Sequence, residues 1–336
     1  MKELIVPVDY EPILGLYETQ MAIKLVKDSF QKHLSEELNL RRVSAPLFVD
    51  PSSGLNDNLN GVERPVSFDI KDDKALRGEV VQSLAKWKRY ALGKYHFPVH
   101  EGLYTDMNAI RRDEELDNIH SLYVDQWDWE KVILFGDRQT AYLEETVRLI
   151  YKALKDTEND VNAKYPELGK ILPEEISFID SEALLKRYPG KSPKEREYLF
   201  AQEKKAIFIE RIGGVLSDGK PHDLRAPDYD DWSLNGDIIV YYPTLDIALE
   251  LSSMGIRVTA ESLKKQLALT HQEARSALPF QKAILANELP YTIGGGIGQS
   301  RLCMFYLKKA HIGEVQCSLW PKAMVEEASK NGIPLL

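Results

Sequence analysis

Four glycines within five positions near the C-terminal end constrain the fold more than any other stretch of the chain. They occupy residues 294–296 and 298, after a short β-rich segment at 291–293 and before an apolar-faced segment at 301–309 that is typical of a helix. Glycine lets the backbone pass close to a ligand and tolerates positive φ. A helix start adds free N–H donors, and Arg301 in the first turn adds a bidentate cation. The stretch therefore predicts an anion-binding turn between a strand and a helix, although a glycine-rich turn alone more often only connects core elements.

Composition argues against several classes of protein. The 336 residues carry 43 Lys+Arg and 52 Asp+Glu, and the net charge of -9 disfavours general attraction to a nucleic-acid backbone. The two cysteines, Cys303 and Cys317, lack metal-ligand spacing, so we expect free thiols in a reducing cytosol rather than a disulfide framework or a zinc site. No apolar run approaches membrane-spanning length and no signal-peptide core stands at the start, which predicts a cytoplasmic protein.

The order of the expected elements predicts the fold class. Strands seldom alternate with helices in a βαβ rhythm, which favours an α+β fold with a mostly antiparallel central sheet flanked by helices. No repeat, low-complexity tract or long linker divides the chain, so a single domain over residues 1–336 is expected. Helical spacing over residues 18–38 leads into an extended segment, 40–49, which Pro46 interrupts. This helix and strand, about 18–50, form a plausible dimer surface.

Apolar patterning places the remaining elements. Strands are expected at residues 66–70, 79–84, 102–112, 238–242 and 247–258, and helices at 85–92, 137–165, 260–269 and 280–289. The helix at 85–92 is basic, and taken alone it suggests a solvated helix face.

The stretch from 125 to 130 alternates strictly, as a half-buried strand does. One face carries Gln126, Asp128 and Glu130, and the other carries Trp127 and Trp129. Because tryptophans need cover, we expect this strand to form one wall of a polar cleft rather than a solvent-facing edge.

One set of polar residues suits a nucleoside triphosphate. Arg111, Arg301 and the glycine stretch suit phosphates, while Glu250 with Asp237 could hold Mg²⁺ through oxygen. The chain has neither a GxxxxGK[ST] P-loop nor a kinase-type catalytic loop, so those two phosphoryl-transfer sites are excluded.

A second set suits a small zwitterion. Lys88 and Arg257 offer cations for a carboxylate, and Asp128 with Gln126 suits an ammonium group. Asp57 lies in a loop at 54–61 that is rich in turn formers, where its carboxylate is either functional or merely solvated.

Together these residues resemble the catalytic core of class II aminoacyl-tRNA synthetases, and the aspartate and asparagine enzymes most closely. Residues 18–46 resemble the family's first motif, 111–113 with 120–130 the second, and 294–301 the third. Residues 83–88 and the spacing of Glu250, Ser253 and Arg257 match the aspartate subgroup. The chain departs from these enzymes in two places. It has no room for an N-terminal anticodon-binding barrel, and Val124 stands where an adenine-stacking Phe is expected.

The same motifs in combination are similar, over essentially the full length, to those of ammonia-dependent asparagine synthetases. The resemblance implies that ATP adenylates the β-carboxylate of L-aspartate and that ammonia then attacks β-aspartyl-AMP to give L-asparagine. The roles it carries over are catalysis for Asp57, Arg111 and Arg301; aspartate binding for Ser83, Lys88, Gln126, Asp128, Asp230 and Arg257; ATP binding for Arg111, Asp237, Glu250, Ser253, Gly296, Gly298 and Arg301; and Mg²⁺ binding for Glu250 and Asp237. It further implies a homodimer that uses aspartate, ATP and ammonia and contacts neither nucleic acid nor membrane.

Within this scheme Arg111 holds the α-phosphate, and Arg301 reaches the γ-phosphate and the adenine face of ATP. Asp57 is expected to help bind or deprotonate ammonium. No glutaminase domain is visible, so free ammonia is the expected nitrogen donor.

Two other functions remain open. A stand-alone synthetase-like enzyme would load an amino acid onto tRNA or a protein lysine, although the net charge and the missing anticodon domain disfavour tRNA. A synthetase-like regulatory subunit would bind an amino acid without chemistry, although it would not need Arg111, Glu250 and Arg301 together.

Overall fold

Helix α1 (Leu16–Leu38) shows how the sequence sets the elements of this fold. Its buried residues recur every three or four positions, at Ala22, Val26, Phe30 and Leu34, so that one face packs inward. The helix ends at Asn39, which adopts the left-handed conformation with a φ of 56°. The structure is a computed structural model that describes residues 4–59 and 61–336. Residues 1–3 and 60, part of the single domain expected over 1–336, lie outside the described residues.

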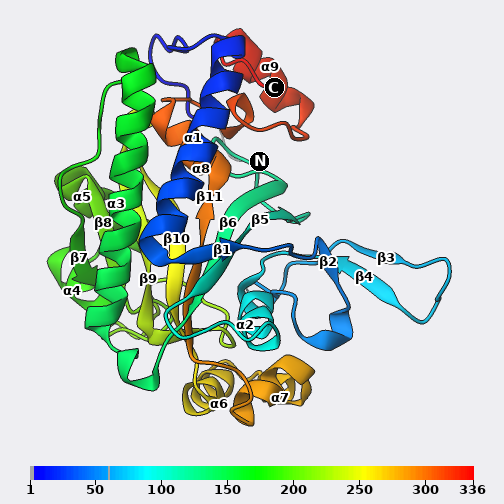
Figure 1. Cartoon of the computed structure of the whole chain (residues 1–336). Helices are drawn as coiled ribbons and strands as arrows, with labels where there is room; N and C mark the ends of the chain where they lie inside the picture. The colour runs from blue at the N-terminus through cyan, green and yellow to red at the C-terminus, as the bar shows by residue number, and fades with distance from the viewer. Residues whose placement is uncertain (1–3, 60) are drawn as a thin grey trace.

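Within the described residues, an eight-stranded sheet crosses the centre of the molecule (Figure 1). From one edge to the other its strands are β1 (Leu40–Arg42), β5 (Gly102–Ile110), β6 (Tyr123–Val132), β11 (Thr292–Gly298), β10 (Ile247–Arg257), β9 (Asp230–Tyr242), β8 (Ala206–Glu210) and β7 (Ser177–Asp180). The β1–β5 and β7–β8 pairs are parallel, and the other neighbouring pairs are antiparallel. The expected α+β fold with a mostly antiparallel sheet is confirmed.

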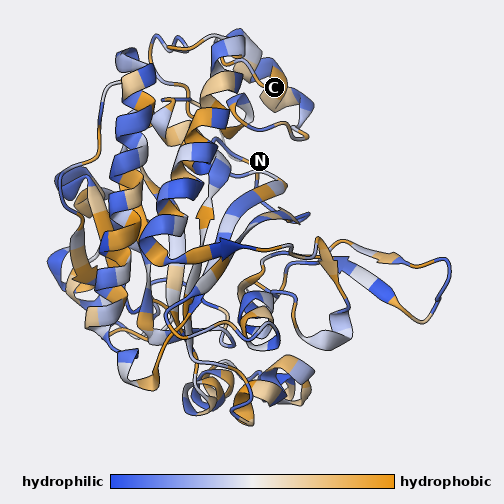
Figure 2. Cartoon of the chain, in the orientation of Figure 1, coloured by the Kyte–Doolittle hydropathy of each residue, from blue (hydrophilic) through white to orange (hydrophobic). Residues whose placement is uncertain are grey.

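Helices pack around this sheet. The long helices α1 and α3 (Thr140–Lys164) lie side by side over one face (Figure 1), and their visible sides are largely hydrophilic (Figure 2). The other α-helices of the described residues are α2 (Ala85–Lys94), α4 (Ser181–Arg187), α5 (Pro193–Lys204), α6 (Ala260–Leu269), α7 (Pro279–Leu285), α8 (Gln299–Tyr306) and α9 (Lys322–Lys330). None of the described helices is both long and apolar enough to cross a membrane.

The alternation in β6 divides the molecule as predicted. Trp127 and Trp129 are fully buried, and the ring centroid of Trp127 lies 4.7 Å from that of Phe30 on α1. The tryptophan face of the strand therefore belongs to the core under α1. Gln126 and Asp128 project from the opposite face, where they are free to line a site.

The glycine-rich stretch is a strand, and the predicted turn is wrong. Residues 294–298 lie inside β11, between β6 and β10, and none of them has a positive φ. A Cβ on Gly295 would lie 2.6 Å from the Cβ of Met254, and one on Gly296 would lie 2.6 Å from Gln126 Oε1. The glycines are needed for space, because side chains of the neighbouring strands lie over them. Helix α8 follows as expected, with Arg301 in its first turn.

Several expected boundaries shift for tertiary reasons. The strand expected at 79–84 ends at Val80, because β4 (Arg77–Val80) belongs to a separate sheet with β2 (Phe48–Val49) and β3 (Ser67–Asp69) (Figure 1). Residues 82 and 83 leave that sheet and lead into α2. The strand expected at 238–242 begins at Asp230, since residues 230–237 pair with β10 and β8 despite their polar character.

The basic helix α2 is buried rather than solvated. Lys86, Lys88 and Arg89 are each 3% exposed or less. Arg89 donates hydrogen bonds to Pro290 O at 2.9 Å and to Val258 O at 2.7 Å. The basic residues of α2 therefore connect elements inside the protein. Their sequence pattern alone does not distinguish this role from that of a solvated helix face.

Candidate active site

A cavity of about 570 Å³ opens on the face of β6 that carries Gln126 and Asp128. Strands β6, β10 and β11 contribute one wall, while the start of α2 and loop residues 223–226 and 229 contribute others. Every predicted site residue except Asp237 lines this cavity. They are Asp57, Ser83, Lys88, Arg111, Gln126, Asp128, Asp230, Glu250, Ser253, Arg257, Gly296, Gly298 and Arg301.

Lys88 joins two walls of the cavity. Its ammonium group is ion-paired with Asp128 and donates a hydrogen bond to Gly295 O at 2.7 Å. Burial lowers the pKa of Lys88 below its ordinary value, although the Asp128 carboxylate acts in the opposite direction. Asp128 Oδ2 is buried without a hydrogen-bond partner in the described structure, so the pair leaves acceptor capacity for a ligand ammonium.

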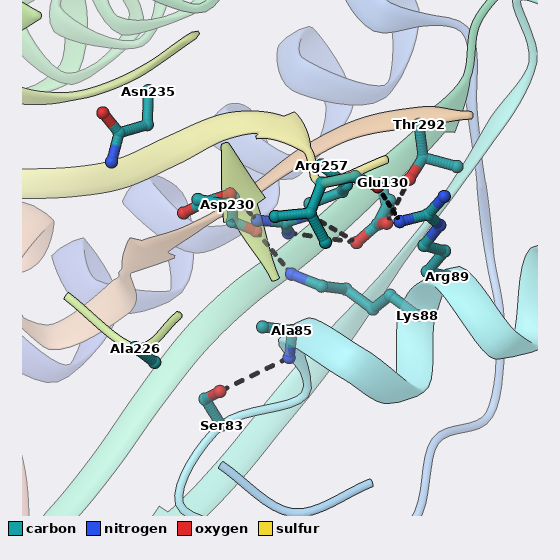
Figure 3. Close-up of polar contacts among 12 residues, drawn as sticks. Ser83, Ala85, Lys88, Arg89, Glu130, Ala226, Asp230, Asn235, Arg257 and Thr292 are labelled. Carbon is teal, nitrogen blue, oxygen red and sulfur yellow. Dashed lines mark hydrogen bonds and ion pairs between the residues drawn. The ribbon is translucent and has the colours of Figure 1, made fainter. Parts of the chain in front are cut away.

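Arg257 is held between two carboxylates at the end of the cavity near Lys88 (Figure 3). Its guanidinium lies 3.0 Å from Glu130 Oε2 and is also paired with Asp230. Thr292 Oγ1 donates to the second oxygen of Glu130 at 2.7 Å. Burial lowers the pKa of Arg257, but Glu130 and Asp230 outweigh that effect and raise it. The cation is therefore permanent and fixed in orientation.

Asp57 is buried in the cavity wall, and the alternative of a solvated loop carboxylate is wrong. It is 3% exposed, and Ser83 Oγ donates a hydrogen bond to its Oδ2 at 2.7 Å. The backbone N–H of Leu59 donates to its Oδ1 at 2.9 Å. Asp57 and Ser83 thus stand together at the cavity, on the same side as the start of α2.

Arg111 and Arg301 present partly exposed guanidinium groups to the cavity. Arg301 donates to Glu250 O at 3.0 Å and lies 4.0 Å from Glu250 Oε1. Arg111 lies 3.9 Å from Glu114, and its buried Nε has no hydrogen-bond partner in the described structure. Two arginines with loose contacts to carboxylates suit binding of an added polyanion.

The two carboxylates named for Mg²⁺ differ in position. Burial raises the pKa of Glu250, but Arg301, Arg225 and Lys194 outweigh it and lower the pKa, so this carboxylate stays charged beside the cavity. Asp237 is ion-paired with Arg225 and lies outside the cavity lining. Burial raises the pKa of Asp237 to about 7, against the effect of Arg225.

Glu250 lines the cavity and fits Mg²⁺ as a carboxylate ligand, whereas Asp237, beside it, is ion-paired with Arg225. Among residues 4–59 and 61–336, no group of three or more His, Cys, Asp or Glu side chains is arranged to hold a metal ion. Mg²⁺ commonly binds through one or two carboxylates together with substrate phosphates and water, which is the kind of site that Glu250 could complete. Asp237 would have to leave Arg225 to take part.

Two cations beside Glu250 were missed by the sequence reasoning. Arg225 lines the cavity, pairs with Asp237, and lies 3.3 Å from Asp223. Its place in the charged stretch 222–232 was a usable signal. Lys194 of α5 also lines the cavity and lies 2.9 Å from Glu197, but a lysine on an amphipathic helix gives no signal in the sequence.

Comparison with known proteins agrees with the geometry of the cavity. Residues 17–332 match the family model described as aspartate-ammonia ligase. An Aspartate--ammonia ligase of Clostridium perfringens is 59% identical over 336 residues, with 100% of both chains covered. One from Lactobacillus johnsonii is 56% identical over 334 residues, with 99% of both chains covered.

Solved structures confirm the class II synthetase-like fold. Asparaginyl-tRNA synthetase from Pyrococcus horikoshii, complexed with asparaginyl-adenylate, aligns with a TM-score of 0.65 and 12% identity, covering 90% of this chain and 70% of that one. An aspartyl-tRNA synthetase from Entamoeba histolytica aligns with a TM-score of 0.60 and 12% identity, covering 89% and 58%. At this identity the likeness concerns the fold alone. The family match and the full-length relatives show that the chain belongs to the aspartate–ammonia ligase family.

Proposed function

We propose that this chain joins ammonia to the β-carboxylate of L-aspartate at the expense of ATP, and releases L-asparagine, AMP and pyrophosphate. The observation that carries the proposal is one cavity in which fixed charges for a small zwitterion, at Lys88, Asp128 and Arg257, meet two loosely held arginines, Arg111 and Arg301. Membership of the aspartate–ammonia ligase family supports the same reaction. The tRNA-loading and regulatory alternatives gain no support from full-length relatives that carry the ligase name.

The reaction would proceed in two displacements. A β-carboxylate oxygen of aspartate attacks the α-phosphorus of ATP, and the bond to the pyrophosphate oxygen breaks. Ammonia then attacks the carbonyl carbon of β-aspartyl-AMP, a proton is lost, and AMP leaves. Arg111 and Arg301 would stabilise the negative charge that develops on the phosphates in the first step.

The aspartate end of the cavity would bind the substrate by its charges. Lys88 and Arg257 would bind the α-carboxylate, which does not react, and Asp128 with Gln126 and Ser83 would bind the α-ammonium group. Asp230 would act by fixing Arg257, to which it is ion-paired. Burial of these groups favours the proposal, because charge–charge contacts are stronger where water is excluded.

Mg²⁺ is part of the proposal, with Glu250 as its protein ligand. When bound, the ion would neutralise phosphate charge and orient the ATP. Ser253, Gly296 and Gly298 line the cavity near Arg301 and would contact ATP.

Asp57 would handle the ammonium ion. Its carboxylate accepts hydrogen bonds from Ser83 Oγ and from the Leu59 N–H, which hold it at the cavity wall. From there it would bind NH₄⁺ and take one of its protons, and the NH₃ so formed would then attack the adenylate.

The proposal also includes the oligomeric state and the cellular location of the protein. A homodimer formed through α1 and the strands that follow it is supported by exposed apolar residues there, Leu16, Tyr17, Met21, Leu47 and Phe48. A cytoplasmic location is supported by Cys303 and Cys317, which are both unpaired. Sedimentation of the purified protein tests the first and cell fractionation tests the second.

The reaction is tested by supplying aspartate, ATP and ammonium without any macromolecular acceptor. We expect asparagine, AMP and pyrophosphate in equal amounts, dependent on Mg²⁺, and a much lower rate with glutamine in place of ammonium. Asparagine formation that required tRNA or an acceptor protein would overturn the proposal. Aspartate-dependent exchange of pyrophosphate into ATP tests the first step alone, and no exchange would favour the regulatory subunit.

A further inference from the structure

Helix α2 carries another buried ion pair besides Lys88–Asp128. Lys86 Nζ lies 2.9 Å from Asp228 Oδ2, and the two side chains are 2% and 0% exposed. Neither residue lines the cavity, although Ala85 and Lys88 on either side of Lys86 do. Full burial of two charges is often no gain for stability, so the pair calls for another explanation.

Asp228 joins three separate parts of the chain. Besides Lys86 of α2, its Oδ2 accepts a hydrogen bond from Gln281 of α7 at 2.7 Å and one from Arg275 at 3.3 Å. Asp228 itself belongs to the loop that precedes β9. One carboxylate therefore ties the start of α2 to this loop and to the helical segment around α7.

The loop that Asp228 anchors leads directly into the aspartate end of the cavity. Asp230, two residues further on, is paired with Arg257. Gln266 of α6 donates hydrogen bonds to Pro227 O and Asp230 O, both at 2.9 Å. The backbone from 227 to 230 is thus held on both sides of Asp228, by α6 and by the contacts of its own carboxylate.

We infer that Lys86 and Asp228 are positioning residues that fix the distance between Lys88 on α2 and Arg257 on β10. Lys86 holds α2, which carries Lys88, and Asp228 holds the loop that places Asp230 against Arg257. Figure 3 shows Lys88, Asp230 and Arg257 facing one another. That distance sets how well the cavity fits an amino acid with a second carboxylate. The inference deepens the proposed function and rests on it. Arg111 and Arg301 lie on other segments, where their guanidinium groups contact Gln82 O and Glu250 O.

The test compares D228N and K86Q with the full-length wild-type enzyme. We expect the KM for aspartate to rise about 10-fold or more, while kcat and the KM for ATP stay within about 3-fold. The dissociation constant for aspartate, measured by calorimetry without ATP, should rise by the same factor. K309Q is the matched control, because Lys309 forms another buried ion pair, 3.9 Å from Glu314, and neither of these two residues lines the cavity. It should lower the Tm without a selective change in aspartate binding.

The outcomes separate positioning from general packing. If D228N does not fold, K86Q decides, since Arg275 and Gln281 remain at Asp228. A folded K86Q with wild-type aspartate affinity, or with equal losses for aspartate and ATP, would overturn the inference. If the wild-type enzyme forms no asparagine, the proposed function fails, and the calorimetric comparison still tests whether the pair sets the aspartate site.

Discussion

At the scale of single residues, Lys88 is the group most strongly tied to one substrate. It is buried, paired with Asp128, and hydrogen-bonded to Gly295 O. We predict that Lys88→Ala raises the KM for aspartate far more than the KM for ATP, because its lost cation leaves Asp128 unpaired at the aspartate end. Steady-state kinetics with each substrate varied in turn measures this, with the exposed Lys282→Ala as control. Equal effects on both substrates would place Lys88 in a different pocket.

Arg301 tests the ATP end in the same way. Its partly exposed guanidinium makes one close contact, to the carbonyl of Glu250, and is otherwise available to phosphate. We predict that Arg301→Ala lowers kcat/KM for ATP. The loss should correspond to at least about 2–3 kcal/mol of transition-state stabilisation, the scale of one charge-assisted contact. Arg301→Lys keeps the charge but not the two-pronged guanidinium, so its kcat/KM for ATP should lie between those of the wild type and Arg301→Ala. Unchanged kinetics in Arg301→Ala would mean that α8 only supports the fold.

At the scale of elements, β11 shows why its glycines are required. We predict that Gly295→Ala lowers the free energy of unfolding by about 1–3 kcal/mol, because the new methyl group would lie against Met254 in the next strand. Gly136→Ala is the matched control, since a Cβ there meets nothing within 4 Å. Urea denaturation of both variants measures the difference. Equal stability of the two would show that β10 and β11 can separate without cost.

At the scale of the whole molecule, buried carboxylates make stability depend on pH. Glu210, at the end of β8, has one buried oxygen without a hydrogen-bond partner in the described structure. Burial, with help from Glu144, raises the pKa of Glu210 from 4.5 to about 7. The folded state therefore binds a proton more tightly than the unfolded chain. The stabilisation from this proton is complete below pH 4.5 and is lost as the pH rises through 7.

Glu210→Gln should remove this dependence. We predict a higher Tm than wild type at pH 8 and little difference at pH 5, measured by thermal denaturation followed by circular dichroism. Glu288→Gln, at an exposed position, should change the Tm little at either pH. A gain for Glu210→Gln that is the same at both pH values would show that charge at this position is not the cause.

The fold class and the course of β6 follow from the amino-acid pattern, and the family resemblance adds most of the predicted residues that line the cavity. Period-two alternation identified the tryptophan and carboxylate faces of β6, because neighbouring side chains of a strand point in opposite directions. The resemblance of these motifs to a known family implied one site for Arg111, Glu250, Arg257 and Arg301, and all four line the cavity. These are local patterns, so they can be recognised in the sequence without knowledge of contacts between distant residues.

Roles that depend on distant partners became visible once the chain was seen folded. The glycines of β11 suggested a turn, but they lie in a strand and leave room for side chains of β6 and β10. Both of these strands are far away along the chain. The sequence pattern suggested that Lys86 and Arg89 lie on a solvated helix face, but both are buried. Lys86 is paired with Asp228, and Arg89 donates hydrogen bonds to two backbone carbonyls. Asp237 was expected at the metal and is held by Arg225 instead. A charge is buried or exposed according to the partner that folding brings to it, and no local pattern records that partner.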